Sequence, residues 1–307
     1  MSFTIEPLSP ELAFGKTIRG LTSEHIRDSE VRDQLRRHWV EDGMVVFRDG
    51  EINEEFQLAL SRIFGPLETH PVKELLTEGK PELITLFSTP EDTTILDVDG
   101  DVGGGYLGWH KDLVYVQHIN HGGILRALQA SKVGGRTGFI DQIDAYDRLP
   151  EDLKQQIEGL HVVYRLGSFD DMKYMTRASF RVVQTAASAK SVIESVEKHF
   201  PPVSHPLVFV QPETGRKVLN LSPFFAMYIE ELGAEGGHEL LTRLAHHVLD
   251  SPAYHHAWTT GEMILWDNWR MLHSVSPAPV TEERVMQRTT IKGDYGAGRT
   301  LPFPVAA

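Results

Sequence analysis

The chain has 307 residues, with 30 lysines and arginines against 43 aspartates and glutamates and a formal net charge of −13. So acidic a protein is poorly suited to bind nucleic acid, because such affinity comes largely from cationic groups that meet phosphates. The sequence contains no cysteine, which excludes disulfides, iron–sulfur clusters, thiolate zinc sites and a cysteine nucleophile. Any metal must therefore be bound by His, Asp or Glu.

The composition, 41% hydrophobic and 24% charged, is typical of a globular protein. No apolar run approaches the roughly 18 residues of a membrane span, and the first residues lack the basic and apolar regions of a secretory signal. We therefore expect a soluble cytoplasmic protein that binds neither nucleic acid nor membranes. No Gly/Ser/Pro linker divides the chain, so residues 1–307 are predicted to form a single domain.

The first third of the chain mixes helices with a strand. Apolar residues at helical spacing predict a helix over 23–42, which Gly43 ends. The β-branched and aromatic run at 44–48 predicts a strand. Asn53 then begins a second predicted helix over 54–64.

Residues 100–108 are rich in glycine and are expected to form a mobile loop. From Gly122 onward, most apolar runs are short and separated by turn residues, as in antiparallel sheets. Strands are predicted at 124–125, 137–140, 160–164, 207–210, 217–219, 262–266 and 285–291. Helices are predicted at 150–160 and 238–249. The pattern favours a mainly β fold with flanking helices and a double-stranded β-helix (jelly-roll, cupin-like) core over about 108–294.

His110 and Asp112 form the only His-x-Asp triplet in the chain. On extended backbone, residues i and i+2 point to the same face, about 6.6 Å apart along the strand. Both side chains can then bind one ion while Lys111 points away. His273 lies far enough along the chain to come from another strand. Two histidines and one carboxylate on one face of an iron leave open the positions that oxygenase chemistry requires.

Arg284 and Arg288 are four residues apart on a predicted strand, so both side chains could face the barrel interior. Two inward guanidinium groups would need anionic partners, either from the protein or from ligands.

These motifs and their order resemble those of a known family, the TauD/TfdA family of Fe(II)- and 2-oxoglutarate-dependent dioxygenases, named for taurine dioxygenase and the phenoxyacetate-herbicide dioxygenase. The ordered match runs from about Gly15 to Asp294. The motifs that carry it are Trp109-His110-Lys111-Asp112, Gly134-Gly135-Arg136-Thr137, Trp266-Asp267-Asn268 with His273, and Arg284 and Arg288 at eleven and fifteen residues beyond His273.

The resemblance implies that His110, Asp112 and His273 bind Fe(II) and form the catalytic centre. It implies that Thr137 and Arg284 hold the distal carboxylate of the co-substrate 2-oxoglutarate. The expected reaction uses O2 to hydroxylate a small organic substrate, in some relatives with oxidative cleavage, and releases succinate and CO2. Halogenating relatives lack the carboxylate that Asp112 supplies here. A homo-oligomer, dimer or tetramer, is expected because relatives commonly form one.

Arg288 and His70 match positions that meet the acidic group of the substrate in relatives, although a structural salt bridge is the alternative for Arg288. This chain has Gly105-Tyr106-Leu107-Gly108 where taurine enzymes carry an Asn a few residues before the Trp-His pair, which disfavours taurine. Tyr106 and Phe169 would suit an apolar or aromatic ligand body. Further candidates of this kind are Leu113, Tyr115 and Phe224. We therefore expect an organic acid with a hydrophobic portion, beneath a lid within about 72–107 and 167–181.

Two other functions compete with this hypothesis. A non-catalytic jelly-roll binding module would retain a metal without the co-substrate. A metal-dependent hydrolase on the same barrel would need neither 2-oxoglutarate nor O2. The pairs His246-His247 and His255-His256 lack the i, i+4 spacing of helical zinc ligands and no third ligand accompanies them.

Overall fold

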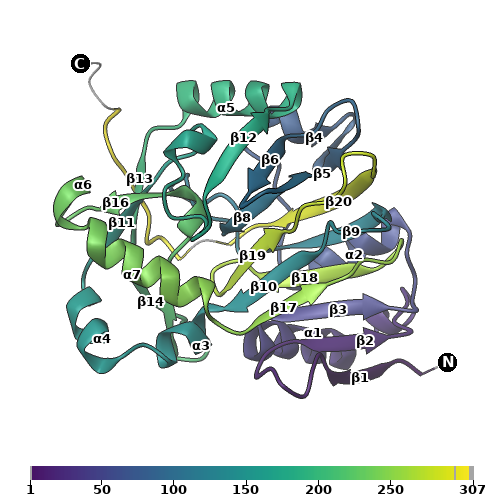
Figure 1. Ribbon diagram of the computed structural model, residues 1–307. Coiled ribbons are helices and arrows are strands. Elements are labelled where there is room, and N and C mark those ends of the chain that lie inside the picture. The colour runs from purple at the N-terminus through teal and green to yellow at the C-terminus, as the bar shows by residue number, and fades with distance from the viewer. Residues whose placement is uncertain (1, 294, 304–307) are drawn as a thin grey trace.

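The computed structural model describes residues 2–293 and 295–303. The expected domain limits at residues 1 and 307, and the expected end of the core near residue 294, lie outside these ranges. The N-terminal strands and helices lie at one side of the molecule (Figure 1). None of the described helices is both long and apolar enough to cross a lipid bilayer.

Eight strands form the larger sheet, in the order β1-β2-β3-β18-β9-β20-β5-β4. Neighbouring strands are antiparallel, except that β2 and β3 are parallel. The bounds are β1 Thr4–Pro7, β2 Lys16–Arg19, β3 Met44–Arg48, β18 Met263–Asp267, β9 Gly122–Gln129, β20 Arg284–Ile291, β5 Lys80–Ser88 and β4 Leu76–Thr77.

A four-stranded antiparallel sheet, in the order β17-β10-β19-β8, forms the other wall of the barrel. Its strands are β17 Ala253–His256, β10 Thr137–Asp141, β19 Met271–Val275 and β8 Leu107–His110. The two sheets face each other, because Leu125 of β9 and Arg288 of β20 line the same cavity as His110 and His273. This arrangement confirms the prediction of a mainly β fold with a jelly-roll core.

Smaller sheets and helices surround the barrel. One sheet contains β16 Ala226–Ile229, β11 His161–Tyr164, β13 Val203–Pro206 and β21 Arg299–Thr300. A second sheet contains β12 Phe180–Gln184, β6 Ile95–Val98 and β7 Asp101–Gly104. A third contains β14 Val208–Val210 and β15 Lys217–Leu219. The helices are α1 Ser29–Asp42, α2 Glu54–Phe64, α3 Gln142–Asp147, α4 Glu151–Ile157, α5 Ala187–His199, α6 Gly233–Gly236 and α7 His238–Leu249.

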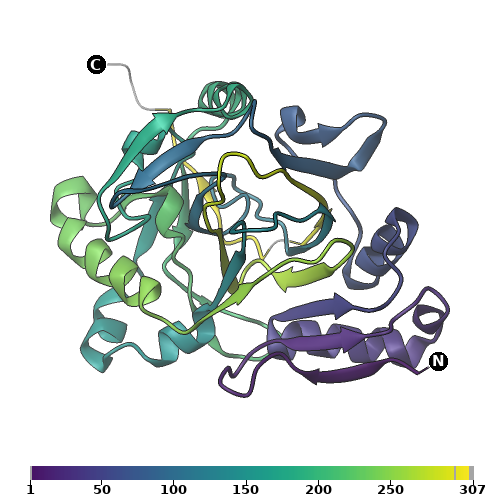
Figure 2. The same cartoon turned by 45° about the vertical axis from the view of Figure 1, so that its right-hand side comes forward.

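Helices α1 and α2 cover the outer face of the larger sheet. Their buried apolar side chains, among them Leu35, Trp39 and Phe56, form one core cluster with Ile124 and Leu265 of the sheet. Helix α7 packs against the sheet of β11 and β16 on the opposite side of the barrel, as the two views show (Figures 1 and 2). These helices therefore pack outside the barrel, and the site lies between the two facing sheets.

Local signals explain several helix ends, with side-chain caps at the starts of α1, α2 and α3. The strand β3 and the helices α2 and α7 have their predicted bounds. The first helix begins at Ser29 rather than residue 23, because Asp28 adopts an extended conformation and its side chain accepts a hydrogen bond from Glu30 N. It ends as predicted at Gly43, whose φ of 77° lies in the left-handed region that glycine favours.

The prediction of a loop over 100–108 is wrong for most of its length, since β7 and the start of β8 lie there. The glycines serve close packing: a Cβ at Gly103 would come within 2.5 Å of the Pro277 Cβ. The expected lid ranges contain β4 to β7 and the first two residues of β12, and β5 is hydrogen-bonded to β20 within the larger sheet. Movement of these segments stays a prediction.

A buried ion pair ties helix α1 to the barrel. Arg270 Nε and Nη2 donate to the two carboxylate oxygens of Asp141 at 2.9 and 2.7 Å. Arg270 Nη1 also donates to the carbonyl oxygens of Val40 and Glu41 at 3.1 and 2.9 Å. Both charged side chains are almost fully buried, so each depends on the other for solvation.

We expect Arg270→Met to lower the free energy of unfolding by about 3–5 kcal/mol, because it leaves the Asp141 carboxylate buried without a counter-ion. Urea denaturation measures the change. Arg216→Met is the matched control: it removes an exposed pair with Asp147, which should cost less than about 1 kcal/mol. Equal small losses in the two variants would contradict this role of Arg270.

Candidate active site

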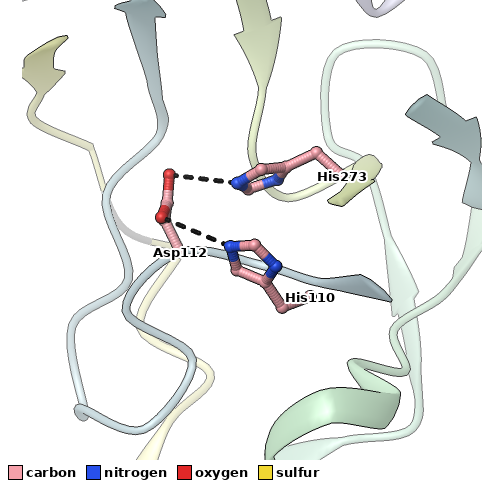
Figure 3. Close-up of side chains that lie close together, drawn as sticks. All are labelled: His110, Asp112 and His273. Atoms are coloured by element: carbon pink, nitrogen blue, oxygen red, sulfur yellow. Dashed lines mark ion pairs between the residues drawn. The ribbon is translucent and has the colours of Figure 1, made fainter. Parts of the chain in front are cut away.

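Three potential metal ligands lie together beside strands β8 and β19 of the four-stranded barrel sheet (Figure 3). His110 ends β8 and lies directly across from His273 of the antiparallel strand β19. Asp112 lies just past the end of β8, with His110 Nε2 3.9 Å from its Oδ1 and His273 Nε2 3.5 Å from its Oδ2. One ligand atom from each residue falls within 4.8 Å of the others. The residues that the sequence singled out are therefore close enough to hold one ion.

The His110 ring is held in the form that can bind a metal. Its Nδ1 lies 2.7 Å from the carbonyl oxygen of Gly108. Since a carbonyl can only accept, Nδ1 carries the hydrogen, and Nε2 keeps its lone pair toward Asp112. Burial, and secondarily the neighbouring His273, lowers the pKa of His110 to about 3, so the ring is neutral at pH 7.

The backbone of Asp112 is held by Asn268. The Asn268 side chain accepts a hydrogen bond from Asp112 N at 3.0 Å and donates one to Asp112 O at 2.9 Å. Lys111 points the other way, as predicted, and donates to Asn220 Oδ1 at 2.7 Å and to Trp269 O at 2.5 Å. Sequence reasoning missed this role of Asn268, although the Trp-Asp-Asn motif that contains it was recognised.

Arg288 forms an ion pair with Asp112 through Nη1 and Oδ2. Burial alone would raise the pKa of Asp112, but Arg288 and His273 hold that pKa well below its usual value. The Nε and Nη2 groups of Arg288 are buried and have no hydrogen-bond partner among the described residues. Arg288 can therefore neutralise Asp112 and still offer N–H groups to a second anion.

Arg284 also lines the cavity, but no ion pair joins it to an acidic side chain within residues 2–293 and 295–303. Its Nη2 donates to Thr137 Oγ1 at 3.3 Å, and its buried Nε has no partner there. Burial lowers the pKa of Arg284 to about 10. A guanidinium in this position lacks a counter-ion, which a bound carboxylate would supply.

The triad and both arginines line one cavity of about 170 Å³ between the two sheets. Thr137, His70, Leu113 and Tyr115 line it too. Sequence reasoning missed Leu75, Ile84, Leu86, Leu107, Leu125, Phe225 and Val275, and it treated Trp266 as packing beside the site. Most of these belong to strands whose inward faces cannot be told from ordinary core without the fold.

Three of the predicted substrate residues, Tyr106, Phe169 and Phe224, lie outside the cavity lining, although the Phe224 ring lies 6.0 Å from the His110 ring between centroids. Tyr106 is half-buried and packs against the hydrophobic core. Phe169 contacts the ring of Phe224, with centroids 5.8 Å apart, and borders a separate surface groove with Val182 and Ile193. The structure thus places Tyr106 and Phe169 outside the cavity that holds the triad, while His70 and Arg288 line it.

The cavity carries an excess of positive charge. Its lining contains one carboxylate, Asp112, and two guanidinium groups, Arg284 and Arg288. Burial, and secondarily Arg288, lowers the pKa of His70 to about 4, so His70 and His110 are neutral at pH 7. A metal-bound His273 must be neutral as well, so in the metal-bound site the side chains of the protein leave one positive charge unmatched.

Comparison with known proteins agrees with this geometry. A sequence model of the family described as "Taurine catabolism dioxygenase TauD, TfdA family" matches residues 4–290. The chain is 32% identical over 303 residues to an (S)-phenoxypropionate/alpha-ketoglutarate-dioxygenase of Sphingobium herbicidovorans, covering 98% of each chain. It is 30% identical over 301 residues to an alpha-ketoglutarate-dependent 2,4-dichlorophenoxyacetate dioxygenase of Cupriavidus pinatubonensis, covering 96% of this chain and 99% of that one.

A crystal structure of a taurine dioxygenase from Burkholderia xenovorans has the same fold, with a TM-score of 0.72 at 23% identity over 99% of this chain and 96% of that one.

We expect Arg284→Met to leave the free energy of unfolding of the ligand-free protein unchanged or to raise it by up to about 2 kcal/mol, since it removes a buried charge without a counter-ion. Denaturant titration measures this. Arg148→Met, at an exposed pair with Asp144, controls for the substitution itself and should change little. A loss of more than 2 kcal/mol in Arg284→Met would mean that the guanidinium is satisfied by the protein.

Proposed function

The chain belongs to the TauD/TfdA family and is an Fe(II)- and 2-oxoglutarate-dependent dioxygenase, and from this premise we propose that its substrate is a monoanionic organic acid with a hydrophobic body. Aryloxyalkanoic acids are the proposed class. The observation that carries the proposal is the unmatched positive charge of the cavity, together with its apolar wall.

The proposed iron ligands are His110, Asp112 and His273. Two neutral imidazole nitrogens and one carboxylate oxygen form a donor set that suits Fe(II) and leaves positions open for other ligands. When bound, the iron supplies O2 activation, by which 2-oxoglutarate is oxidised to succinate and CO2 and the substrate gains an oxygen atom. We assign the distal carboxylate of 2-oxoglutarate to Arg284 and Thr137. Arg284 lacks a counter-ion, and its Nη2 lies 3.3 Å from Thr137 Oγ1.

Charge balance supports an acidic substrate. A divalent metal adds two positive charges to the single excess charge of the cavity, and the 2-oxoglutarate dianion removes two. One positive charge is then left for the substrate, and a buried charge is costly unless it is paired. A monoanion restores neutrality. Arg288 is the proposed partner of that anion, because two of its buried N–H groups have no partner among the described residues. His70 lines the same cavity and adds no charge of its own.

The remaining lining is apolar and defines the other half of the ligand. Leucine, isoleucine and valine side chains from β5, β8 and β19 share it with the aromatic rings of Tyr115 and Phe225. These two rings contact each other edge to face, with centroids 5.1 Å apart. A hydrophobic or aromatic body gains free energy by burial here. The acid group would bind Arg288 and the body would extend along this wall.

The two competing functions fit the site less well. A structural metal site or a metal-dependent hydrolase has no use for a second cationic group in the cavity such as Arg284, which has no acidic partner in the described part of the chain. The relatives at 30–32% identity are named as alpha-ketoglutarate-dependent enzymes.

The first test is succinate release by the Fe(II)-loaded protein with 2-oxoglutarate in air. Aryloxyalkanoic acids are expected to raise the rate above its substrate-free value, and alkylsulfonates, taurine and amino acids serve as comparison acids. Neutral aromatic ethers and esters of the same size should not raise it. His110→Ala is the control and should be silent throughout. If wild type and control are equally silent, the enzymatic role of this site is wrong.

We expect Arg288→Gln to raise KM for the stimulating acid at least about tenfold, since it removes a charge-assisted pair with the substrate anion. The substrate-free turnover of 2-oxoglutarate should keep its KM. Because Arg288 also contacts Asp112, Mn(II) affinity is measured in parallel to show that the metal is still bound. An unchanged KM for the acid in metal-loaded Arg288→Gln would remove Arg288 from substrate recognition.

A further inference from the structure

Thr137 accepts two hydrogen bonds at its hydroxyl oxygen. Trp258 Nε1 donates to Thr137 Oγ1 at 2.8 Å, and Arg284 Nη2 donates to the same atom at 3.3 Å. Thr137 is buried at the start of β10 and lines the cavity, whereas Trp258 lies two residues past the end of β17 and is half-buried. The indole ring therefore reaches the wall of the cavity without lining it.

The direction of these bonds determines what Thr137 can offer a ligand. A hydroxyl group has two acceptor lone pairs and one hydrogen to donate. Trp258 and Arg284 can only donate, so they fill both lone pairs. Within residues 2–293 and 295–303, no hydrogen bond is donated by the Thr137 hydroxyl. Its hydrogen is therefore available to a group inside the cavity.

We propose that Trp258 is a positioning residue for 2-oxoglutarate: its indole N–H orients the Thr137 hydroxyl as a donor toward the distal carboxylate held by Arg284. The inference rests on the proposed assignment of that carboxylate to Arg284 and Thr137. Without the indole N–H, one lone pair of the Thr137 oxygen is free. The hydroxyl can then rotate so that this lone pair faces a carboxylate oxygen of the ligand and repels it. Preorganised donors bind more tightly than donors that must be oriented on binding.

The loop that carries Trp258 is held in place by an acidic residue. Thr259 N donates to Glu262 Oε2 at 2.9 Å, and the His256 ring lies 3.0 Å from the same oxygen. Arg48 forms an ion pair with the other oxygen of Glu262 at 2.8 Å. The His256 ring contacts the Trp258 ring edge to face, with centroids 4.5 Å apart. These contacts fix the indole, so that its N–H bond to Thr137 is built into the protein before any ligand binds.

The test is a double-mutant cycle read by calorimetric titration of 2-oxoglutarate into the Mn(II)-loaded protein. Trp258→Phe keeps an aromatic ring but removes the N–H, and we expect it to weaken 2-oxoglutarate binding about threefold to tenfold. Thr137→Val should weaken binding at least as much. In the double variant, the loss should equal that of Thr137→Val alone, because Trp258 acts through the hydroxyl. Thr137→Ser keeps the hydroxyl and should retain affinity.

Trp39→Phe is the matched control, because the buried Trp39 Nε1 has no hydrogen-bond partner among the described residues. It should leave 2-oxoglutarate binding unchanged. Mn(II) affinity and the melting temperature are measured for every variant, and Trp258→Phe should change neither by much. A fall in Mn(II) affinity parallel to that for 2-oxoglutarate in Trp258→Phe would indicate a general structural role and overturn the inference.

The remaining outcomes separate the inference from the function on which it rests. If Thr137→Val weakens binding but Trp258→Phe does not, or if the two losses add, the role of Trp258 is wrong and the clamp stands. If neither Thr137→Val nor Arg284→Met weakens binding, the carboxylate lies elsewhere and both proposals fail.

Discussion

The site depends on buried positive charge that the protein itself does not neutralise. Among the described residues, Asp112 is the only carboxylate that lines the cavity, and Arg284 and Arg288 face the same space. Uncompensated buried charge costs folding free energy, which the barrel tolerates because hydrophobic burial stabilises it elsewhere. The cost is recovered when anions bind. The excess of positive charge therefore links the stability of the empty protein to its preference for acidic ligands.

The fold creates this excess by strand alternation. On β20, Arg284, Met286 and Arg288 point inward. Gln287 and Thr289 point outward to α2, where Gln287 Nε2 donates to Glu54 Oε2 at 2.9 Å and Thr289 Oγ1 lies 2.8 Å from Ser61 Oγ. On β9, Leu125 faces the cavity while Arg126 faces outward and donates to Gln57 and Gln287. A shift of one residue in register would exchange these faces. The polar network beneath α2 thus holds the two inward arginines in position.

Sequence reasoning located the triad, both arginines and Thr137 because short motifs with fixed spacing carry them. It also found β3, α2 and α7, whose periodicity and end residues are local signals. It missed α5, whose few apolar residues leave only Val196 buried. It missed the strands around Gly103, whose glycines serve close packing rather than flexibility. The apolar wall and the contact of Trp258 with Thr137 depend on pairing between distant strands, so no local pattern reveals them. For the same reason Tyr106 and Phe169, chosen by their neighbourhood in the chain, lie outside the cavity lining.

The central claim, that the loaded cavity has one positive charge left for its substrate, is tested most directly by equilibrium binding. An aryloxyalkanoic acid and its neutral amide of equal size are titrated into the protein loaded with Mn(II) and 2-oxoglutarate. The account predicts that the acid binds at least about tenfold more tightly than the amide, and that Arg288→Gln removes most of this difference. Equal binding of acid and amide to the wild-type protein would contradict it.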